Sequence, residues 1–251
     1  MRILVIGGAS DMGYAIASEF VKQQQAEVIL ASRNKELIEK RVKDLSVRYQ
    51  VHAEAVFLDV TDMASHQNFY ENLKQTSGGV PDVVLVAAGY QDEGHHPLSN
   101  NQLIQVMDTN LTGLISLLEL ISVDFEARGS GAIIGISSVA GLRGKLNNYI
   151  YAAAKAGFTT YLSGLRQRLY QSPKTRKIQI MTVLPGFVAT KLTAHMKLNP
   201  KLLASPSDVG KQVVQAFVKK KDVVFVSPKW RWIMAIITHI PEVIYKRLKL
   251  G

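Results

Sequence analysis

Hydrophobic positions along this chain form short continuous runs, and longer stretches of helical period separate those runs. Short segments at residues 3–6, 27–31, 52–58, 82–87, 132–136, 178–183 and 223–226 read as strands, and several of them are continuous runs of Val, Ile and Leu. Apolar runs without polar alternation are typical of parallel strands that are covered on both faces. The stretches at residues 12–24, 35–49, 62–75, 101–127, 149–170 and 207–220 have the spacing and the polar face of helices.

Strands that alternate with helices predict the α/β fold class. Right-handed crossovers then give a doubly wound parallel sheet, a Rossmann fold, of about seven strands with helices on both faces. No repeat or linker interrupts the pattern, so we expect residues 1–251 to form a single domain. Residues 228–251 form an extension beyond this pattern and predict one or two further helices, broken at Pro241.

Composition and charge exclude several classes of protein for this chain. The chain has no cysteine, which excludes disulfide scaffolds, thiolate metal sites and cysteine nucleophiles. Residues 1–190 hold 18 Lys and Arg against 17 Asp and Glu, whereas residues 191–251 hold 12 against 3. The net charge of +10 therefore lies almost entirely in the last quarter of the chain. No signal segment and no apolar stretch of about 18–20 residues is evident, which predicts a cytoplasmic protein.

A glycine-rich turn follows the first predicted strand and opens a helix. Glycines at this place permit a tight turn, and the first N–H groups of the helix face an anion such as a dinucleotide diphosphate. The alternative is a structural turn without a ligand. The candidate cofactor-binding residues of this turn are Gly7, Ala9, Ser10, Asp11, Met12 and Gly13.

The end of the second predicted strand indicates which dinucleotide would bind. Sites selective for NAD place an acidic residue there to hold the ribose 2′-hydroxyl. This chain has Ser32, Arg33 and Asn34 instead, and Arg33 could pair with a 2′-phosphate. The sequence therefore favours NADP(H) over NAD(H), with a solvated loop residue as the alternative for Arg33.

Tyr151, Lys155 and Ser138 form the candidate catalytic set. Tyr151 and Lys155 are four residues apart, on one face of a predicted helix. Ser138 follows a predicted parallel strand, and ligands of open α/β sheets bind at such strand ends. A phenol can donate a proton to a carbonyl oxygen that a serine hydroxyl polarises, and a neighbouring ammonium is expected to lower the phenol pKa. An ordinary helix-surface pair of Tyr and Lys is the alternative.

In this order and spacing, the motifs resemble the short-chain dehydrogenase/reductase superfamily along nearly the whole chain. That resemblance implies an NAD(P)-dependent oxidoreductase that reduces a keto group by hydride transfer, or catalyses the reverse reaction. It also implies a homodimer or homotetramer. The matching segments are residues 7–13, Asp59-Val60, Ala87-Ala88-Gly89, Asn110, the set Ser138, Tyr151 and Lys155, and residues 184–190.

The resemblance also implies a role for each residue. Tyr151 would donate the proton, Lys155 would tune Tyr151 and bind the nicotinamide ribose, and Ser138 would orient the substrate carbonyl. Asn110 would support a proton relay, with a helix-interior polar group as its alternative. Asp59 and Val60 would contact the adenine, and Val188 and Thr190 would face the nicotinamide carboxamide, with a helix N-cap as the alternative for Thr190. The remaining cofactor candidates are Ala87, Ala88, Gly89, Pro185 and Gly186.

Three positions depart from the family pattern. Ile6 replaces the Thr before the first glycine, Asp11 replaces the middle glycine of the turn, and Ala87 replaces the Asn of Asn-Ala-Gly. Asp11 can adopt a left-handed backbone or cap the helix, but its charge opposes a nearby phosphate. These departures concern cofactor geometry and affinity rather than the catalytic set.

The substrate pocket is expected between residues 89–97, residues 142–148 and a lid at residues 191–206. Lys191, His195, Met196 and Lys197 would then lie near its mouth. His95 and His96 are adjacent, and their side chains diverge, so we expect solvated loop residues and no metal site.

The basic extension at residues 228–251 suggests a substrate class. It resembles the C-terminus of the ketoreductase subunit of bacterial decaprenylphosphoryl-ribose 2′-epimerase, which implies a keto sugar on a lipid-linked or otherwise anionic carrier. Its Trp, Tyr and Lys/Arg content suits peripheral contact with the inner membrane face, and packing on the core or on another subunit is the alternative. Two other functions stay open, a 3-oxoacyl-(acyl carrier protein) reductase and a non-catalytic dinucleotide-binding scaffold protein. No motif of nucleic-acid binding is present.

Overall fold

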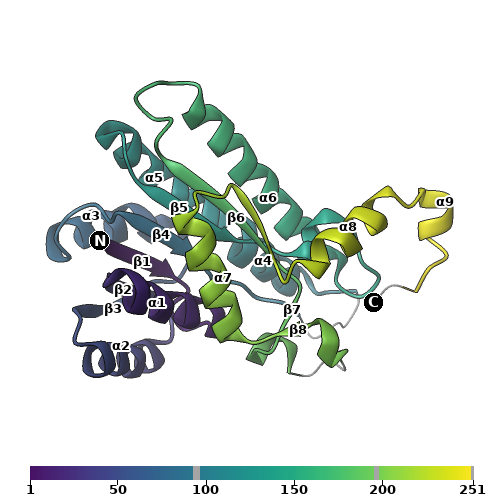
Figure 1. The fold of residues 1–251 in the computed structure, drawn as a ribbon, viewed down its shortest axis with the longest axis horizontal. Coiled ribbons are helices and arrows are strands. Elements are labelled where there is room, and N and C mark those ends of the chain that lie inside the picture. The colour runs from purple at the N-terminus through teal and green to yellow at the C-terminus, as the bar shows by residue number, and fades with distance from the viewer. Residues whose placement is uncertain (93–96, 195–197, 250–251) are drawn as a thin grey trace.

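Seven parallel strands form the main sheet, in the order β3-β2-β1-β4-β5-β6-β9 (Figure 1). The computed structural model describes residues 1–92, 97–194 and 198–249. The strands are β1 (Arg2–Ile6), β2 (Glu27–Ser32), β3 (Ala53–Phe57), β4 (Val83–Val86), β5 (Ala132–Ile136), β6 (Gln179–Pro185) and β9 (Val223–Val226). This is the doubly wound sheet that the apolar runs predict.

Helices cover both faces of the sheet. One face packs against α1 (Asp11–Gln24), α2 (Lys35–Tyr49) and α7 (Pro206–Val218). The other face packs against α3 (His66–Thr76), α5 (Gly113–Arg128) and α6 (Tyr149–Tyr170), with α4 (Asn100–Met107) beside α6. Two C-terminal helices, α8 (Lys229–His239) and α9 (Glu242–Tyr245), extend from one end of the molecule (Figure 1).

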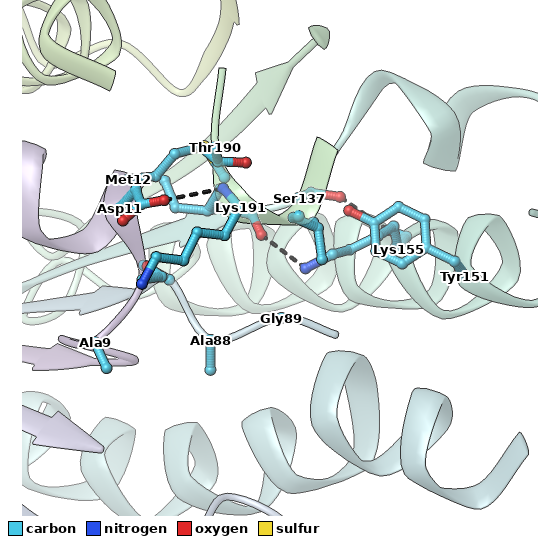
Figure 2. Close-up of a pocket in the computed structure, with 14 residues that line it drawn as sticks. Ala9, Asp11, Met12, Ala88, Gly89, Ser137, Tyr151, Lys155, Thr190 and Lys191 are labelled. Atoms are coloured by element: carbon cyan, nitrogen blue, oxygen red, sulfur yellow. Dashed lines mark hydrogen bonds between the residues drawn. The ribbon is translucent and has the colours of Figure 1, made fainter. Parts of the chain in front are cut away.

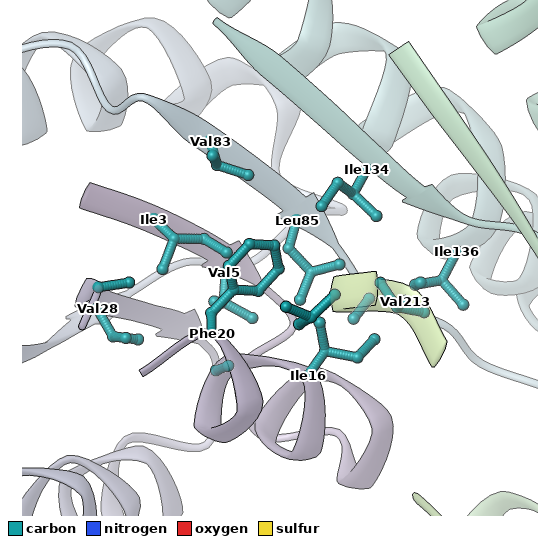
Figure 3. Close-up of a cluster of buried hydrophobic side chains, with 14 of the residues drawn as sticks. Ile3, Val5, Ile16, Phe20, Val28, Val83, Leu85, Ile134, Ile136 and Val213 are labelled. Carbon is teal, nitrogen blue, oxygen red and sulfur yellow. The ribbon is translucent and has the colours of Figure 1, made fainter. Parts of the chain in front are cut away.

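Residues within one strand alternate between the two apolar layers. Ile3 and Val5 of β1 pack toward Ile16 and Phe20 of α1, as Figure 3 shows. Leu4 and Ile6 belong to the opposite layer, with side chains of α5 and α6. These four side chains are fully buried, and burial of this kind stabilises each by about 1.5–3 kcal/mol relative to exposure. The continuous apolar run is therefore explained by cover on both faces.

The predicted helix at residues 101–127 is interrupted in the structure. A π-helical turn, Asp108–Thr112, separates α4 from α5. A short 3-10 helix, Met63–Ser65, likewise precedes α3, and a two-stranded pair of β7 (Phe187–Val188) and β8 (Leu203–Ala204) has no counterpart in the prediction. The other predicted strands and helices agree with the structure within about two residues, the usual scatter of element ends.

One helical run, residues 100–128, has the length and composition of a membrane span, with a mean hydropathy of 1.4 over its most apolar window. The expectation that no stretch reaches this length was therefore wrong for α4 and α5. Half of that window is buried inside the fold, and Leu117, Ile121 and Phe125 pack in the sheet-facing layer. Its apolar character is explained by packing against the sheet.

The crossovers reverse direction between β1 and β4. From β1 the chain proceeds to β2 and β3, whereas from β4 it proceeds to β5 and β6 on the other side. Loops at the carboxyl ends of β1 and β4 therefore separate and leave a crevice, which is where ligands of open α/β sheets bind. The glycine turn follows β1 and Ala87-Ala88-Gly89 follows β4, so both predicted segments lie at this crevice.

Candidate active site

Three recesses adjoin one another at the carboxyl edge of the sheet. The outer recess is lined by Gly7, Ala9, Ser10, Ser32, Arg33, Leu58, Val60, Ala88, Gly89 and Thr109. The central recess adds Asp11, Met12, Ala87, Ile136, Ser137, Tyr151, Lys155, Thr190, Lys191 and Leu192. The inner chamber is lined chiefly by Gln91, Ser138, Val139, Ala140, Lys145, Asn148, residues 185–188, Thr193 and Trp230. Neighbouring recesses share lining residues, so together they form one elongated trough.

The glycine turn forms the floor between the outer and central recesses. Gly7 has φ +89°, and a Cβ there would lie 2.3 Å from the backbone nitrogen of Ala88, so only glycine fits where the two loops meet. Ser10 caps α1 by accepting a hydrogen bond from the Gly13 amide at 2.9 Å. Asp11 and Met12 follow as the first residues of α1, where backbone N–H groups have no intrahelical acceptor. These amides form an anion-binding helix start.

Asp11 neither caps the helix nor adopts a left-handed backbone, contrary to both expectations for it. Ser10 occupies the cap, and Asp11 is the first helical residue. The Asp11 carboxylate pairs with the guanidinium of Arg41 at 3.1 Å, and Arg41 also donates to the carbonyls of Gly8 and Ser10 at 2.9 and 2.7 Å. Arg41 therefore neutralises the charge of Asp11 and holds the backbone of the glycine turn.

The predicted ribose residues separate into two groups. Ser32 and Arg33 line the outer recess, and Arg33 pairs loosely with Asp59 at 3.5 Å. The Asn34 side chain accepts the Leu37 amide as the N-cap of α2, so it has a structural task. Asp59 accepts from the backbone amide and hydroxyl of Thr61 and does not line the outer recess.

Tyr151 and Lys155 lie one turn apart on α6 and face the trough from the side opposite the glycine turn (Figure 2). Both side chains are buried, and the Lys155 Nζ lies 5.7 Å from the centroid of the Tyr151 ring. Lys155 donates a hydrogen bond to the Ile136 carbonyl at 3.1 Å. Ser138 lines the inner chamber together with Tyr151, and its side chain accepts the Ala140 amide at 3.1 Å. The structure thus brings the three residues together.

Burial controls the acidity of this pair. It raises the pKa of Tyr151 to about 12, while the neighbouring Ser138 hydroxyl acts in the opposite direction. Burial also lowers the pKa of Lys155 to about 8. The expected lowering of the phenol pKa by the ammonium is therefore wrong for this state of the protein, because desolvation outweighs the other influences. The phenol keeps its proton at neutral pH.

Two buried polar groups hold the candidate set in position. Ser137 donates to the Lys155 carbonyl at 3.0 Å and shares a hydrogen bond with Thr159 at 2.6 Å, which joins the end of β5 to α6. Asn110, within the π-helical turn, donates to the carbonyls of Tyr90 and Val106 at 2.6 and 2.8 Å. Its alternative as a helix-interior polar group thus describes its contacts in this structure.

The C-terminal extension forms one wall of the inner chamber. Trp230 packs directly on Gly186, where a Cβ would lie 1.9 Å from the indole nitrogen, and meets Phe187 edge-on at 5.4 Å. Pro185 and Val188 line the same chamber. Trp230 and Met234 are buried, so one face of α8 packs on the core.

Arg143 joins this extension to the loop that precedes α6. Its guanidinium donates to the carbonyls of Thr238 and Ile240 at 3.4 and 3.2 Å and pairs with Glu242 at 2.6 Å. It also stacks over the Tyr245 ring at 4.2 Å. These contacts satisfy carbonyls at the end of α8, which have no intrahelical donor.

The predicted lid contributes short elements to the trough. Thr190 is the N-cap of the 3-10 turn Lys191–Thr193, as its alternative proposed, and it lines the trough as well. The Lys191 amide donates to Asp11 at 3.1 Å (Figure 2). His95 and His96, and the mouth residues His195, Met196 and Lys197, lie outside the described residues.

Comparison with known proteins identifies the family. Residues 1–201 match the family model described as short chain dehydrogenase. This chain belongs to the short-chain dehydrogenase family. Its similarity to an uncharacterised oxidoreductase of Mycobacterium tuberculosis is 25% identity over 246 residues, which cover 98% of this chain and 96% of that protein.

Two further proteins show similarity to this chain of the short-chain dehydrogenase family. An NADP-dependent 3-hydroxy acid dehydrogenase of Schizosaccharomyces pombe is 25% identical over 234 residues, 88% of each chain. A short-chain dehydrogenase from Sphingobium yanoikuyae, solved in complex with NADPH, has a TM-score of 0.79 at 21% identity over 96% of each chain. The last similarity supports the fold that the strands and helices show.

Sequence reasoning missed several residues of this short-chain dehydrogenase site. Arg41 had no signal, because 30 residues separate it from Asp11 and its helix face reads as solvated. The role of Ser137 as an anchor was hidden behind the neighbouring Ser138. Trp230 was assigned to the extension, and only the short distance to Gly186 shows that it forms a chamber wall.

Proposed function

We propose that this chain is an NADP(H)-dependent ketoreductase, in which Tyr151 donates a proton to the carbonyl oxygen of a substrate in the inner chamber. The preferred substrates would carry an anionic group, and a keto sugar on a lipid-linked phosphate is the candidate that the tail resemblance favours. The observation that carries the proposal is the shared position of Ser138, Tyr151 and Lys155 at the junction of the central recess and the inner chamber.

The residues of the trough fit a dinucleotide phosphate. The amides at the start of α1 suit a diphosphate, and Gly7 lets the two loops approach each other closely. Arg33 lines the outer recess with about half of its side chain exposed, so it can pair with a 2′-phosphate. NAD(H) is the weaker alternative, since neither Ser32 nor Asn34 supplies an acidic group for a 2′-hydroxyl. When bound, the reduced nicotinamide supplies the hydride.

The proton chemistry follows from burial. With a pKa raised to about 12, the Tyr151 phenol is protonated at neutral pH and holds the proton that a reduced carbonyl oxygen needs. Ser138 lines the inner chamber beside Tyr151, so its hydroxyl could hold the same carbonyl oxygen. Lys155 would bind the ribose and return a proton to the phenolate, with Asn110 holding the neighbouring backbone.

The test is reduction of a panel of ketones, followed as NADPH oxidation by the wild-type protein and by Tyr151→Phe. We expect kcat to fall by about 10²–10⁴-fold in the variant, since it retains the ring and loses the proton. The NADPH dissociation constant, measured by fluorescence titration, should change by less than about threefold, because phosphate contacts supply most of the affinity.

Tyr170→Phe is the matched control, since Tyr170 is an exposed phenol at the far end of α6. Turnover that persists in Tyr151→Phe and equals that of Tyr170→Phe would overturn the catalytic assignment. The panel includes a 3-oxoacyl thioester, so preference for that member would favour the acyl-carrier-protein reductase alternative. NADPH binding without reduction of any ketone would favour a non-catalytic scaffold.

The outer face of the C-terminal helices supports peripheral contact with an anionic membrane. Trp232 and Ile236 of α8 are each 70% exposed. Val243 and Ile244 of the following helix α9 are exposed as well. Residues 228–249 carry five Lys and Arg but one acidic residue, Glu242, which Arg143 already pairs. An apolar face with a basic surround is typical of helices that lie in a membrane interface.

Vesicle flotation tests this contact. We expect the full chain to float with vesicles rich in phosphatidylglycerol and not with neutral phosphatidylcholine vesicles. The double variant Trp232→Ser with Ile236→Ser should lose flotation, while Val47→Ser with Val123→Ser, which removes exposed apolar groups elsewhere, should keep it. Equal behaviour of both variants would remove the membrane proposal. The molar mass of the protein without vesicles, measured by light scattering, tests the homodimer or homotetramer that the family resemblance implies.

A further inference from the structure

The inner chamber contains one ammonium group whose task is unassigned. Lys145 lies in the loop between the short helix Val139–Leu142 and α6, and it is the one charged side chain among the described residues that line the chamber. Its Nζ lies 5.1 Å from the centroid of the Phe187 ring, and the side chain is largely screened from solvent. A cation over an aromatic face is held in place without being neutralised.

Lys145 has no carboxylate partner within 4 Å among the residues that the structure describes, although its neighbour Arg143 is paired with Glu242. Burial without an opposite charge disfavours an ammonium, and accordingly burial lowers the pKa of Lys145. A cation screened from water is usually paired, so the partner of this half-buried one is expected to come from a molecule that enters the chamber.

A second polar group in the same chamber also lacks a partner. The Oδ1 atom of Asn148 is buried and accepts no hydrogen bond in the described part of the structure, and Asn148 makes no side-chain cap for α6. Asn148 and Lys145 line the inner chamber with Tyr151 and Ser138. The chamber therefore offers an acceptor for a hydroxyl and a cation for an anion beside the proposed reaction site.

We propose that Lys145 determines substrate specificity by binding a carboxylate or phosphate group on the ketone, while Asn148 accepts a hydrogen bond from a hydroxyl of the same molecule. This inference rests on the proposed function and adds the residue that selects the anionic substrate. The Arg143 contacts hold the loop of Lys145 against the C-terminal helices, so the ammonium is presented from a supported position. Phe187 lies beneath it.

A matched series of aryl ketones tests the proposal. The probes are methyl 4-acetylbenzoate as the neutral member, 4-acetylbenzoate as the carboxylate and 4-acetylphenyl phosphate as the phosphate. For the wild type we expect kcat/KM with NADPH to be at least about tenfold higher for one or both anions than for the ester. Preference between the two anions tells which group the chamber takes.

Lys145→Met should remove this preference, with kcat/KM for the anions falling to within about twofold of kcat/KM for the ester in the same variant. Lys145→Arg, which keeps the charge, should retain most of it. Lys219→Met, an exposed charge removed at the end of α7, is the control for net charge and should behave as the wild type. An equal anion preference in Lys145→Met and the wild type, or no preference in the wild type, would overturn the proposal.

A binding measurement separates this inference from the proposed function. The chain has two tryptophans, so Trp232→Phe leaves Trp230 of the chamber wall as the single tryptophan. Saturable quenching of Trp232→Phe by 4-acetylbenzoate, and its loss in the double variant Trp232→Phe with Lys145→Met, would support the anion site even if no ketone is reduced. Quenching that is unchanged by Lys145→Met, or absent from both proteins, contradicts it. Loss of reduction for every ketone with intact quenching contradicts the proposed function alone.

Discussion

The carboxylate of Asp11 accepts a hydrogen bond from the backbone amide of Lys191 at 3.1 Å, across 180 residues of sequence. Its second oxygen pairs with Arg41, so one acidic side chain at the glycine turn holds both the turn and the first residue of the predicted lid. The family glycine at this position can make neither contact. The substitution therefore adds a link between the two sides of the trough.

Asp11→Asn should tighten NADPH binding severalfold. The substitution removes a negative charge beside the helix start that faces the diphosphate, and it leaves the positive charge of Arg41 in place. Asparagine can still accept the Lys191 amide, so the link to the lid persists. Fluorescence titration at low and high salt measures the effect, and the gain should shrink at high salt. Weaker binding would mean that the carboxylate orients the turn more than it repels phosphate.

Arg33→Ala should raise the KM for NADPH by about tenfold and leave the KM for NADH within about twofold, because a single charge-assisted contact to the 2′-phosphate is lost. Steady-state kinetics with each cofactor measures the ratio. Arg176→Ala, an exposed arginine away from the trough, controls for net charge. An equal effect on both cofactors would remove Arg33 from the 2′-phosphate site.

The stability of the protein should depend on pH through Lys155. Its pKa is lowered to about 8 in the folded protein and is near 10.5 when unfolded, so the unfolded chain binds more protons between these values. Stability attributable to this group therefore rises from pH 8 to pH 10.5 and is lost as the pH falls again. Relative to Lys155→Met, the wild type should gain on the order of 2–3 kcal/mol over this window in urea unfolding. A constant difference between the two proteins would contradict the buried ammonium.

Gly186→Ala should destabilise the protein by about 1–3 kcal/mol, because the new methyl group overlaps the Trp230 indole. Near-ultraviolet circular dichroism should change as the indole moves, and chemical unfolding gives the free energy. Gly164→Ala is the control, since its Cβ meets nothing within 4 Å in α6. That change should instead stabilise the helix by about 0.5–1 kcal/mol. Tolerance of alanine at both positions would refute the close contact.

Arg143→Ala should loosen the C-terminal helices without unfolding the core. It removes the donors that satisfy Thr238 and Ile240 and the ion pair with Glu242. Amide hydrogen exchange should increase for residues 235–248 and for the loop at residues 142–148, with the sheet unchanged. Arg168→Ala, which breaks an ion pair with Glu126 elsewhere, should leave exchange in these segments unaltered.

The strands of the sheet were predictable because their residues satisfy one local condition, cover on both faces. The π-helical turn was not, because residues 101–127 keep an apolar period on both sides of it, and the hydrogen bond from Asn110 to the Tyr90 carbonyl is tertiary. Ser138, Tyr151 and Lys155 were recognisable from spacing, since the ends of parallel strands and the starts of helices meet at one edge.

The electrostatics of the site could not be predicted in this way. The pKa of Tyr151 depends on how completely side chains from several elements exclude water, and this burial raises it. Arg41 and Trp230 reach the site from residues that look like a solvated face and a peripheral tail. Their positions follow from packing, which spacing along the chain does not contain.

The Arg143 contacts have a consequence for how new specificities can be obtained in this enzyme. The loop at residues 142–148 carries the proposed selector Lys145, and the helices that begin at Lys229 both support that loop and form the chamber wall. A graft of either segment from another reductase would leave its counterpart without the matching carbonyls or guanidinium. The two segments form one exchangeable cassette, and libraries that vary both together should retain folded members far more often than libraries that vary one.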